Sequence, residues 1–223
     1  MDTASARAEI LARIRNLQGR PASMHANEVK QARDYIERRP RGPGPGPVSN
    51  LVGLFEEKSK AMLCTVSRVN RLREVPAACA GYLAKEGLVS GTIAIWPALA
   101  ELDWSALGHS SHFGAPSGND LVGISAVACA VAETGTLVFA SRPDEPASTH
   151  LLPETHIAIV KVDQVVHTME DAFSRLRAEG RVMPRALNFV SGPSRTADIE
   201  QTIVLGAHGP YRVHLILVEG SHD

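Results

Sequence analysis

Apolar positions recur along the chain with two periods, one typical of helices and one typical of strands. Near the N-terminus, Ile10, Ile14 and Leu17 follow a helical spacing between arginines, which predicts an amphipathic helix over residues 4–17. A second, strongly charged helix is predicted over 28–38.

Proline and glycine dominate residues 40–47, a composition that cannot supply the regular hydrogen bonds of a helix or a sheet. We therefore expect a surface linker that ends an N-terminal helical arm at residues 1–47, followed by an α/β domain at 48–223. The arm is either flexible and open to a protein partner, or a helical flap packed on its own domain.

From residue 50 onward, helical and strand patterns alternate. Helices are expected over 51–62, 75–83 and 168–180, the last starting at a capping box of Thr168 and Asp171. Strands are expected over 64–69, 92–96, 156–160, 187–190 and 213–218, while 121–131 and 136–141 are either two consecutive strands or a helix and a strand. This alternation predicts a mostly parallel central sheet flanked by helices, with ligands bound beyond the carboxyl ends of the strands.

A short polar turn, Glu133, Thr134, Gly135 and Thr136, lies at the mouth of an apolar run. Hydroxyls and backbone amides in such a position can face an anionic ligand. Glu133 is a candidate catalytic base or nucleophile if its carboxylate is partly desolvated. The alternative interpretation is a tight turn with a solvated glutamate.

A second polar stretch contains Gly192, Ser194, Arg195 and Thr196, where a strand is expected to give way to a helix. With Ser194 or Gly192 at the helix N-cap, free amides and a two-pronged contact from Arg195 would form an anion cradle. The alternative is an ordinary N-cap with Arg195 paired to a nearby acid. Both polar stretches begin or end strands, so both could lie on one carboxyl edge of the sheet.

Three histidines are candidates for functional groups. His208, in a glycine-proline turn, is either a proton carrier or a surface residue. His109 and His112 lie in a loop rich in Gly and Ser, which we expect to be mobile and near the site. A metal there would need a further ligand cluster, which the sequence does not supply, so no metal site is expected.

Composition narrows the functional classes. The chain has 223 residues, 44% of them hydrophobic, and a net charge of -1, which gives no general reason to bind nucleic acid or an anionic membrane. Three widely spaced cysteines form no disulfide framework, and no apolar run reaches the roughly 20 residues of a membrane span, so a cytoplasmic location is expected. Without a Gly-x-Gly-x-x-Gly after a strand, no flavin or nicotinamide site is expected.

Several stretches resemble the LUD-domain family, in its lactate-utilisation protein C group, over roughly residues 51–218. They are Ala-Glu-Thr-Gly-Thr-Leu at 132–137, Leu152-Pro153 with His156-Ile157, Gly-Pro-Ser-Arg-Thr-Ala-Asp-Ile-Glu-Gln at 192–201 and Gly-Ala-His-Gly-Pro at 206–210. The resemblance implies a fold of the sugar-phosphate isomerase and CoA-transferase-like type. It also implies a role beside two iron-sulfur partner proteins in oxidising L-lactate to pyruvate.

The resemblance sets two further expectations. The chain has no cysteine cluster, so iron-sulfur clusters are expected only in the partner proteins and no cofactor in this chain. Relatives are expected to carry an aspartate five residues before the glutamate of the turn, where this chain has Ala128.

Three functional hypotheses follow. The first is an accessory or substrate-handling subunit of a lactate-oxidising assembly that binds a small carboxylate or phosphorylated ligand at the Glu133 turn and the 194–196 cradle. The second is a stand-alone isomerase or acyl- or CoA-transfer enzyme that acts on a small anionic metabolite through Glu133. The third is a scaffold whose glycine turns only build the fold.

Overall fold

The computed structural model describes residues 3–19, 26–88, 91–180, 184–197 and 203–220. The chain divides into two compact units, Met1–Gly44 and Pro45–Asp223. The first unit contains helices α1 (Ala4–Leu17) and α2 (Ala26–Arg38), so both predicted helices are confirmed, the second starting two residues earlier than expected. Among the described residues, no helix is long and apolar enough to cross a membrane.

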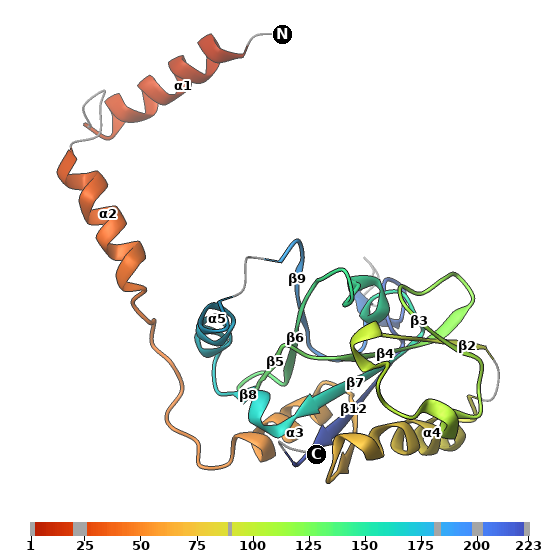
Figure 1. Cartoon of the computed structure of the whole chain (residues 1–223). Coiled ribbons are helices and arrows are strands. Elements are labelled where there is room, and N and C mark those ends of the chain that lie inside the picture. The colour runs from red at the N-terminus through yellow and green to blue at the C-terminus, as the bar shows by residue number, and fades with distance from the viewer. Residues whose placement is uncertain (1–2, 20–25, 89–90, 181–183, 198–202, 221–223) are drawn as a thin grey trace. The chain divides into compact units, whose positions relative to one another are not determined.

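The second unit is built on a six-stranded sheet in the order β1-β12-β7-β4-β2-β3 (Figure 1). Every neighbouring pair of strands in it is parallel, which confirms the predicted parallel sheet. Its strands are β1 (Thr65–Val69), β2 (Thr92–Ile95), β3 (Ser111–Phe113), β4 (Asp120–Ala126), β7 (Thr155–Lys161) and β12 (Arg212–Val218).

Helices α3 (Leu51–Ala61) and α4 (Val75–Lys85) run below this sheet in the view of Figure 1. Helix α3 begins where the Oδ1 atom of Asn50 accepts a hydrogen bond from the Gly53 amide at 2.8 Å, which satisfies one of the unpaired donors of the first turn. The apolar face of α4 is buried, including Val75, Cys79 and Leu83. Both elements agree with the predicted helices.

A second, smaller sheet has the order β8-β5-β6-β9. Strands β5 and β6 are antiparallel, as are β6 and β9, whereas β5 and β8 are parallel. The open alternative for 121–131 and 136–141 is therefore resolved in favour of consecutive strands, with β4 and β5 in the first run and β6 in the second. The four strands are β5 (Cys129–Val131), β6 (Thr136–Ala140), β8 (Val165–Val166) and β9 (Leu187–Val190).

Helix α5 (Met169–Ala178) packs on this smaller sheet, through β5 and β8. The predicted capping box is present, because the Thr168 hydroxyl accepts from the Asp171 amide and the Asp171 carboxylate accepts from the Thr168 amide. Elsewhere the central strands β7 and β12 bury nearly all their side chains on both faces, as parallel strands covered on both sides do.

Candidate functional site

The first predicted motif forms the turn between β5 and β6. Glu133 and Thr134 are exposed there, whereas Gly135 and Thr136 are buried. The side chain of Glu133 is therefore in contact with solvent. A carboxylate that acts as a catalytic base or nucleophile is expected to be partly desolvated, and this turn does not provide such an environment. Its proposed catalytic role stays a prediction from the sequence.

The two predicted motifs meet through hydroxyl groups. The Thr136 hydroxyl lies 2.6 Å from the Thr134 hydroxyl and 2.7 Å from the Ser191 hydroxyl. Strands β6 and β9 bring them together, because Leu137 pairs with Val190 and the residues just beyond this pair face each other. The shared edge belongs to the smaller mixed sheet, so the expectation that both motifs lie on the carboxyl edge of the parallel sheet is wrong.

Two glycines of these motifs pack against the C-terminal end of α3. A β-carbon on Gly135 would lie 2.6 Å from the Ser59 amide nitrogen, and one on Gly192 would overlap the Met62 carbonyl oxygen. Both glycines also have positive φ angles, +64° and +80°, which other residues adopt at a cost. These glycines therefore let the backbone approach the helix closely.

The predicted helix after Ser194 is wrong. Residues Arg195–Ala197 form strand β10, which pairs antiparallel with β11 (Ile203–Leu205). The Ser194 amide donates to the Pro210 carbonyl, and the Ser194 carbonyl accepts from the Gly206 amide, both at 2.9 Å. The Ser194 amide is thus used inside the protein and is not presented at a helix N-terminus. The end of this motif, 198–201, lies outside the described residues.

Arg195 is exposed, and its Nη2 donates to the Met62 carbonyl oxygen at 2.8 Å. This carbonyl lies just after the end of α3, where the last carbonyls of a helix lack intrahelical partners and favour a positive charge. We call Thr134, Thr136, Ser191, Gly192 and Arg195 the motif junction. Of the other predicted site residues, Thr196 is half-buried in β10 and His208 is exposed in the turn before β12.

The predicted loop at His109 and His112 is partly a strand, because Ser111–Phe113 forms β3 beside β2. The His109 ring nitrogens lie 2.5 Å from the Leu107 carbonyl and 2.9 Å from the Leu88 carbonyl. The His112 Nε2 lies 2.9 Å from the Asp120 carboxylate. Strand pairing and these bonds hold both imidazoles, and the expectation of a mobile loop is corrected to that extent.

A cavity of about 230 Å³ opens at the carboxyl ends of the parallel strands, and we call it the carboxyl-edge cavity. Its lining includes the residues that end or follow β2, β4 and β7, where ligands bind in open α/β sheets. The lining residues include Trp96, Ala126, Ala128, Lys161 and Gln164, and Glu145 joins them from the loop after β6. Ala128, at the position where the resemblance leads us to expect an aspartate, is part of this wall.

Polar groups fix the rim of this cavity. The Gln164 side chain accepts from the Lys161 amide at 3.1 Å and donates to the Val127 carbonyl at 3.2 Å, so it links the ends of β7 and β4. No ion pair of Lys161 occurs within the described part of the chain, and Glu145 lies 3.6 Å from Arg142. The lysine therefore supplies a positive charge to a partly enclosed space.

Sequence reasoning does not single out Lys161 and Gln164. A usable signal is present, because both residues closely follow the apolar run 156–160, which is predicted to be a strand. The rule that ligands bind beyond carboxyl ends applies to these residues as much as to the glycine-rich stretches.

A cluster of buried histidines fills the space between the two sheets. The His156 Nε2 lies 2.8 Å from the Ser125 hydroxyl, and His150 stacks on Phe139 with ring centroids 4.1 Å apart. Burial, together with the repulsion that His150 exerts once it is protonated at low pH, lowers the pKa of His156 to about 3, and burial lowers the pKa of His150 to about 4. Both imidazoles are therefore neutral at pH 7.

This α/β architecture, with a cavity at the carboxyl edge of a parallel sheet, has relatives of known family. Residues 118–218 match the LUD domain. A crystal structure of a DUF162 family protein from Deinococcus radiodurans superposes with a TM-score of 0.57 at 26% identity, over 78% of this chain and 99% of that one.

Curated proteins that carry a name are also similar to part of this chain. Lactate utilization protein C of Geobacillus thermodenitrificans is 40% identical over 129 residues, which cover 55% of this chain and 53% of that protein. The protein of the same name from Bacillus subtilis is 42% identical over 100 residues, which cover 44% and 42%. The chain thus spans about half the length of the curated relatives it matches. The predicted resemblance to the LUD-domain family is confirmed, and the match to the family covers residues 118–218.

Proposed function

We propose that the chain takes part in the utilisation of L-lactate, its oxidation to pyruvate, as an accessory or substrate-handling subunit beside iron-sulfur partner proteins. The observation that carries this proposal is the 40% identity over 129 residues to lactate utilization protein C of Geobacillus thermodenitrificans. The lack of a cysteine cluster in this chain supports the assignment of the redox centres to partners.

The ligand in this proposal is a small carboxylate held in the carboxyl-edge cavity. Lys161 offers the charge that a carboxylate needs, and the cavity of about 230 Å³ has room for a ligand of that size with water around it. Gln164 keeps the rim rigid through its bonds to both strand ends. The motif junction has a supporting role in this arrangement, since its polar groups bind one another.

Ala128 bears on which carboxylate fits. An aspartate at this position would add a negative charge to the same wall as Lys161. With alanine, no carboxylate at this position offsets the positive charge of Lys161. We propose that this chain therefore favours a more strongly anionic ligand than relatives that carry the aspartate.

The test is lactate-dependent dye reduction by the reconstituted assembly, with the subunit wild-type, omitted or carrying Lys161→Met. We expect omission to abolish the reaction and Lys161→Met to raise the KM for lactate by roughly tenfold, since a charge-assisted hydrogen bond contributes about 1.5–3 kcal/mol. Lys60→Met is the matched control, because Lys60 is exposed and its ion pair in the described part of the chain is with Glu56, one helical turn away.

Two results would contradict the proposal. Equal reduction with and without the subunit would exclude a role in the assembly. Turnover by the purified chain alone, lost in Glu133→Gln, would favour the stand-alone isomerase or acyl-transfer enzyme, with the exposed turn as its active site.

A further inference from the structure

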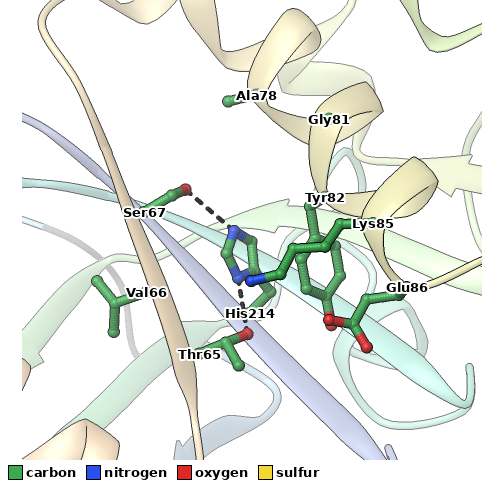
Figure 2. Close-up of a pocket in the computed structure, with 9 residues that line it drawn as sticks. All are labelled: Thr65, Val66, Ser67, Ala78, Gly81, Tyr82, Lys85, Glu86 and His214. Carbon is green, nitrogen blue, oxygen red and sulfur yellow. Dashed lines mark hydrogen bonds between the residues drawn. The ribbon is translucent and has the colours of Figure 1, made fainter.

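We infer that the protein has a second small-molecule site, which binds an anionic metabolite carrying a hydroxyl group beside its acid group. The site is a groove of about 280 Å³ between β1, β12 and α4 (Figure 2). We call it the histidine groove, and its polar lining is Thr65, Ser67, Tyr82, Lys85, Glu86 and His214. The inference goes beyond the proposed function and does not depend on it.

His214 forms the floor of the groove and is 4% exposed. Its Nδ1 lies 2.8 Å from the Thr65 hydroxyl and its Nε2 lies 3.0 Å from the Ser67 hydroxyl, as Figure 2 shows. Burial and the nearby charge of Lys85 lower the pKa of His214 to about 4, so the ring is neutral at pH 7. A neutral ring donates to one hydroxyl and accepts from the other.

This arrangement fixes two hydroxyl groups at the groove without exhausting them. A hydroxyl has one proton to donate and two lone pairs, and the bond to the imidazole uses only one of these. Thr65 is exposed and Ser67 is half-buried, so both can reach a ligand. The groove therefore offers both donors and acceptors, which matches a ligand hydroxyl group.

Lys85 supplies the positive charge. Its side chain extends from α4 across the groove toward the imidazole (Figure 2). Among the described residues it forms no ion pair, and an ammonium group beside fixed hydroxyls suits a carboxylate or a phosphate. Glu86 on the rim disfavours ligands with further negative charge away from the acid group.

The wall of the groove is aromatic. The Tyr82 ring stacks on His214 with centroids 3.9 Å apart and 10° between the planes. This packing holds the imidazole in place, so the hydroxyls do not need a ligand to be ordered. A volume of about 280 Å³ is at the lower end of ligand pockets, which suits a metabolite of a few carbon atoms.

The histidine groove is distinct from the carboxyl-edge cavity. Lys161 at the cavity pairs with Val218 across β7 and β12, and His214 lies four residues earlier on β12. Four residues of strand correspond to about 13 Å. A ligand of a few carbon atoms cannot occupy both sites at once.

The two sites have separate spectroscopic reporters. The His214 ring signals report on the groove, and the Trp96 indole signal reports on the cavity, where its Nε1 donates to the Pro146 carbonyl at 3.2 Å. Assigned NMR spectra of the full chain would be titrated with L-lactate, glycerol 3-phosphate, inorganic phosphate and propionate. Propionate lacks the hydroxyl group of lactate, and the two phosphates separate a phosphate ligand from a carboxylate.

We expect L-lactate or glycerol 3-phosphate to shift the His214 signals, and propionate and inorganic phosphate to bind at least several-fold more weakly. Lys85→Met should weaken binding at the groove by roughly tenfold, the loss expected for one charge-assisted contact. Lys161→Met is the control, and it should leave the His214 shifts unchanged.

Several outcomes would overturn the inference. The first is that the His214 signals respond to none of the four compounds. The second is that they respond equally to lactate and propionate in every titration. The third is that Lys85→Met binds with full affinity. A response of Trp96 alone would overturn this inference and leave the proposed function standing. A response of His214 alone, lost in Lys85→Met, would support the groove while counting against the cavity.

Discussion

The motif junction and the carboxyl-edge cavity lie at opposite ends of the short strand β5, and they use polar groups in opposite ways. At the junction, Thr136 bonds to two neighbouring hydroxyls and Arg195 bonds to the end of α3. At the cavity, Lys161 has no ion pair within the described residues, whereas Gln164 is tied to backbone groups. The region with the more distinctive sequence is therefore the one whose hydrogen bonds stay within the protein.

This difference shows what a glycine-rich motif can mean. Glycine, serine, threonine and arginine occur at ligand sites because they expose amides and offer hydrogen bonds. The same properties let two strands and a helix end pack closely while their hydroxyl groups and Arg195 bond to one another or to the helix end. A lysine just past a strand is less distinctive in sequence, yet its place at the carboxyl edge gives it access to a cavity.

The largest expected effect is that of Gly192→Ala at the motif junction. The new methyl group would overlap the Met62 carbonyl, and the positive φ is unfavourable for alanine, so we expect a loss of about 3 kcal/mol in the free energy of unfolding. Chemical denaturation measures this loss.

Gly180→Ala separates the two causes. Gly180 has a φ of +63°, but a methyl group added there would meet no atom within 4 Å, so only the backbone cost of about 1 kcal/mol should remain. Equal losses in the two variants would show that close packing on α3 does not explain Gly192.

The next largest effect concerns the loss of protein stability at low pH that is caused by His156, which is buried between the two sheets. The pKa of His156 is lowered to about 3 in the folded protein, below the ordinary value of 6.5. Between these two pH values, this histidine is protonated in the unfolded state and neutral in the folded state. Stability is therefore full above about pH 6.5 and falls as the pH drops toward 3, by about 2 kcal/mol between pH 7 and pH 5 for this group.

Thermal unfolding of the wild type and of His156→Gln at several pH values measures this contribution. We expect the variant to be less stable at pH 7 but to lose less stability on acidification. His208→Gln, which changes an exposed histidine, is the control. Parallel pH curves for wild type and His156→Gln would rule out the assigned role.

A smaller effect is expected for Thr136→Val, which keeps the shape of the side chain and removes its two hydroxyl contacts. Because Thr134 and Ser191 are exposed and can bond to water, the cost should be about 1 kcal/mol. Ligand binding at the carboxyl-edge cavity should stay unchanged, as measured by the Trp96 indole signal. Loss of that binding would show that the motif junction and the carboxyl-edge cavity form one site.

The smallest effect is expected for Arg195→Met. The residue is exposed, and its one hydrogen bond in the described structure goes to the Met62 carbonyl, so stability should fall by at most about 1 kcal/mol. Calorimetry with small carboxylates would detect any change in affinity. A large loss of affinity with little loss of stability would support the anion cradle at Arg195 that the sequence predicts.

Much of the fold could be predicted because its signals are local. The spacing of apolar residues in α1 and the capping box of α5 depend on neighbours within a few residues, and both predictions are confirmed. The helix predicted after Ser194 is wrong because its N-cap signal is also local. The pairing of β10 with β11 across residues 198–202 outweighs that signal.

By itself, the sequence determined the alternation of helices and strands, the parallel sheet and the family resemblance, since these depend on short-range periodicity and on motifs that can be read in order. Only the tertiary structure decided that the two polar motifs bind each other at the edge of the smaller sheet. It also decided that Lys161 and His214, which no motif marks, face cavities. The physical reason is that a hydrogen bond or a cavity joins residues far apart in the chain, such as Thr136 and Ser191, and the packing of whole elements sets which groups remain unpaired.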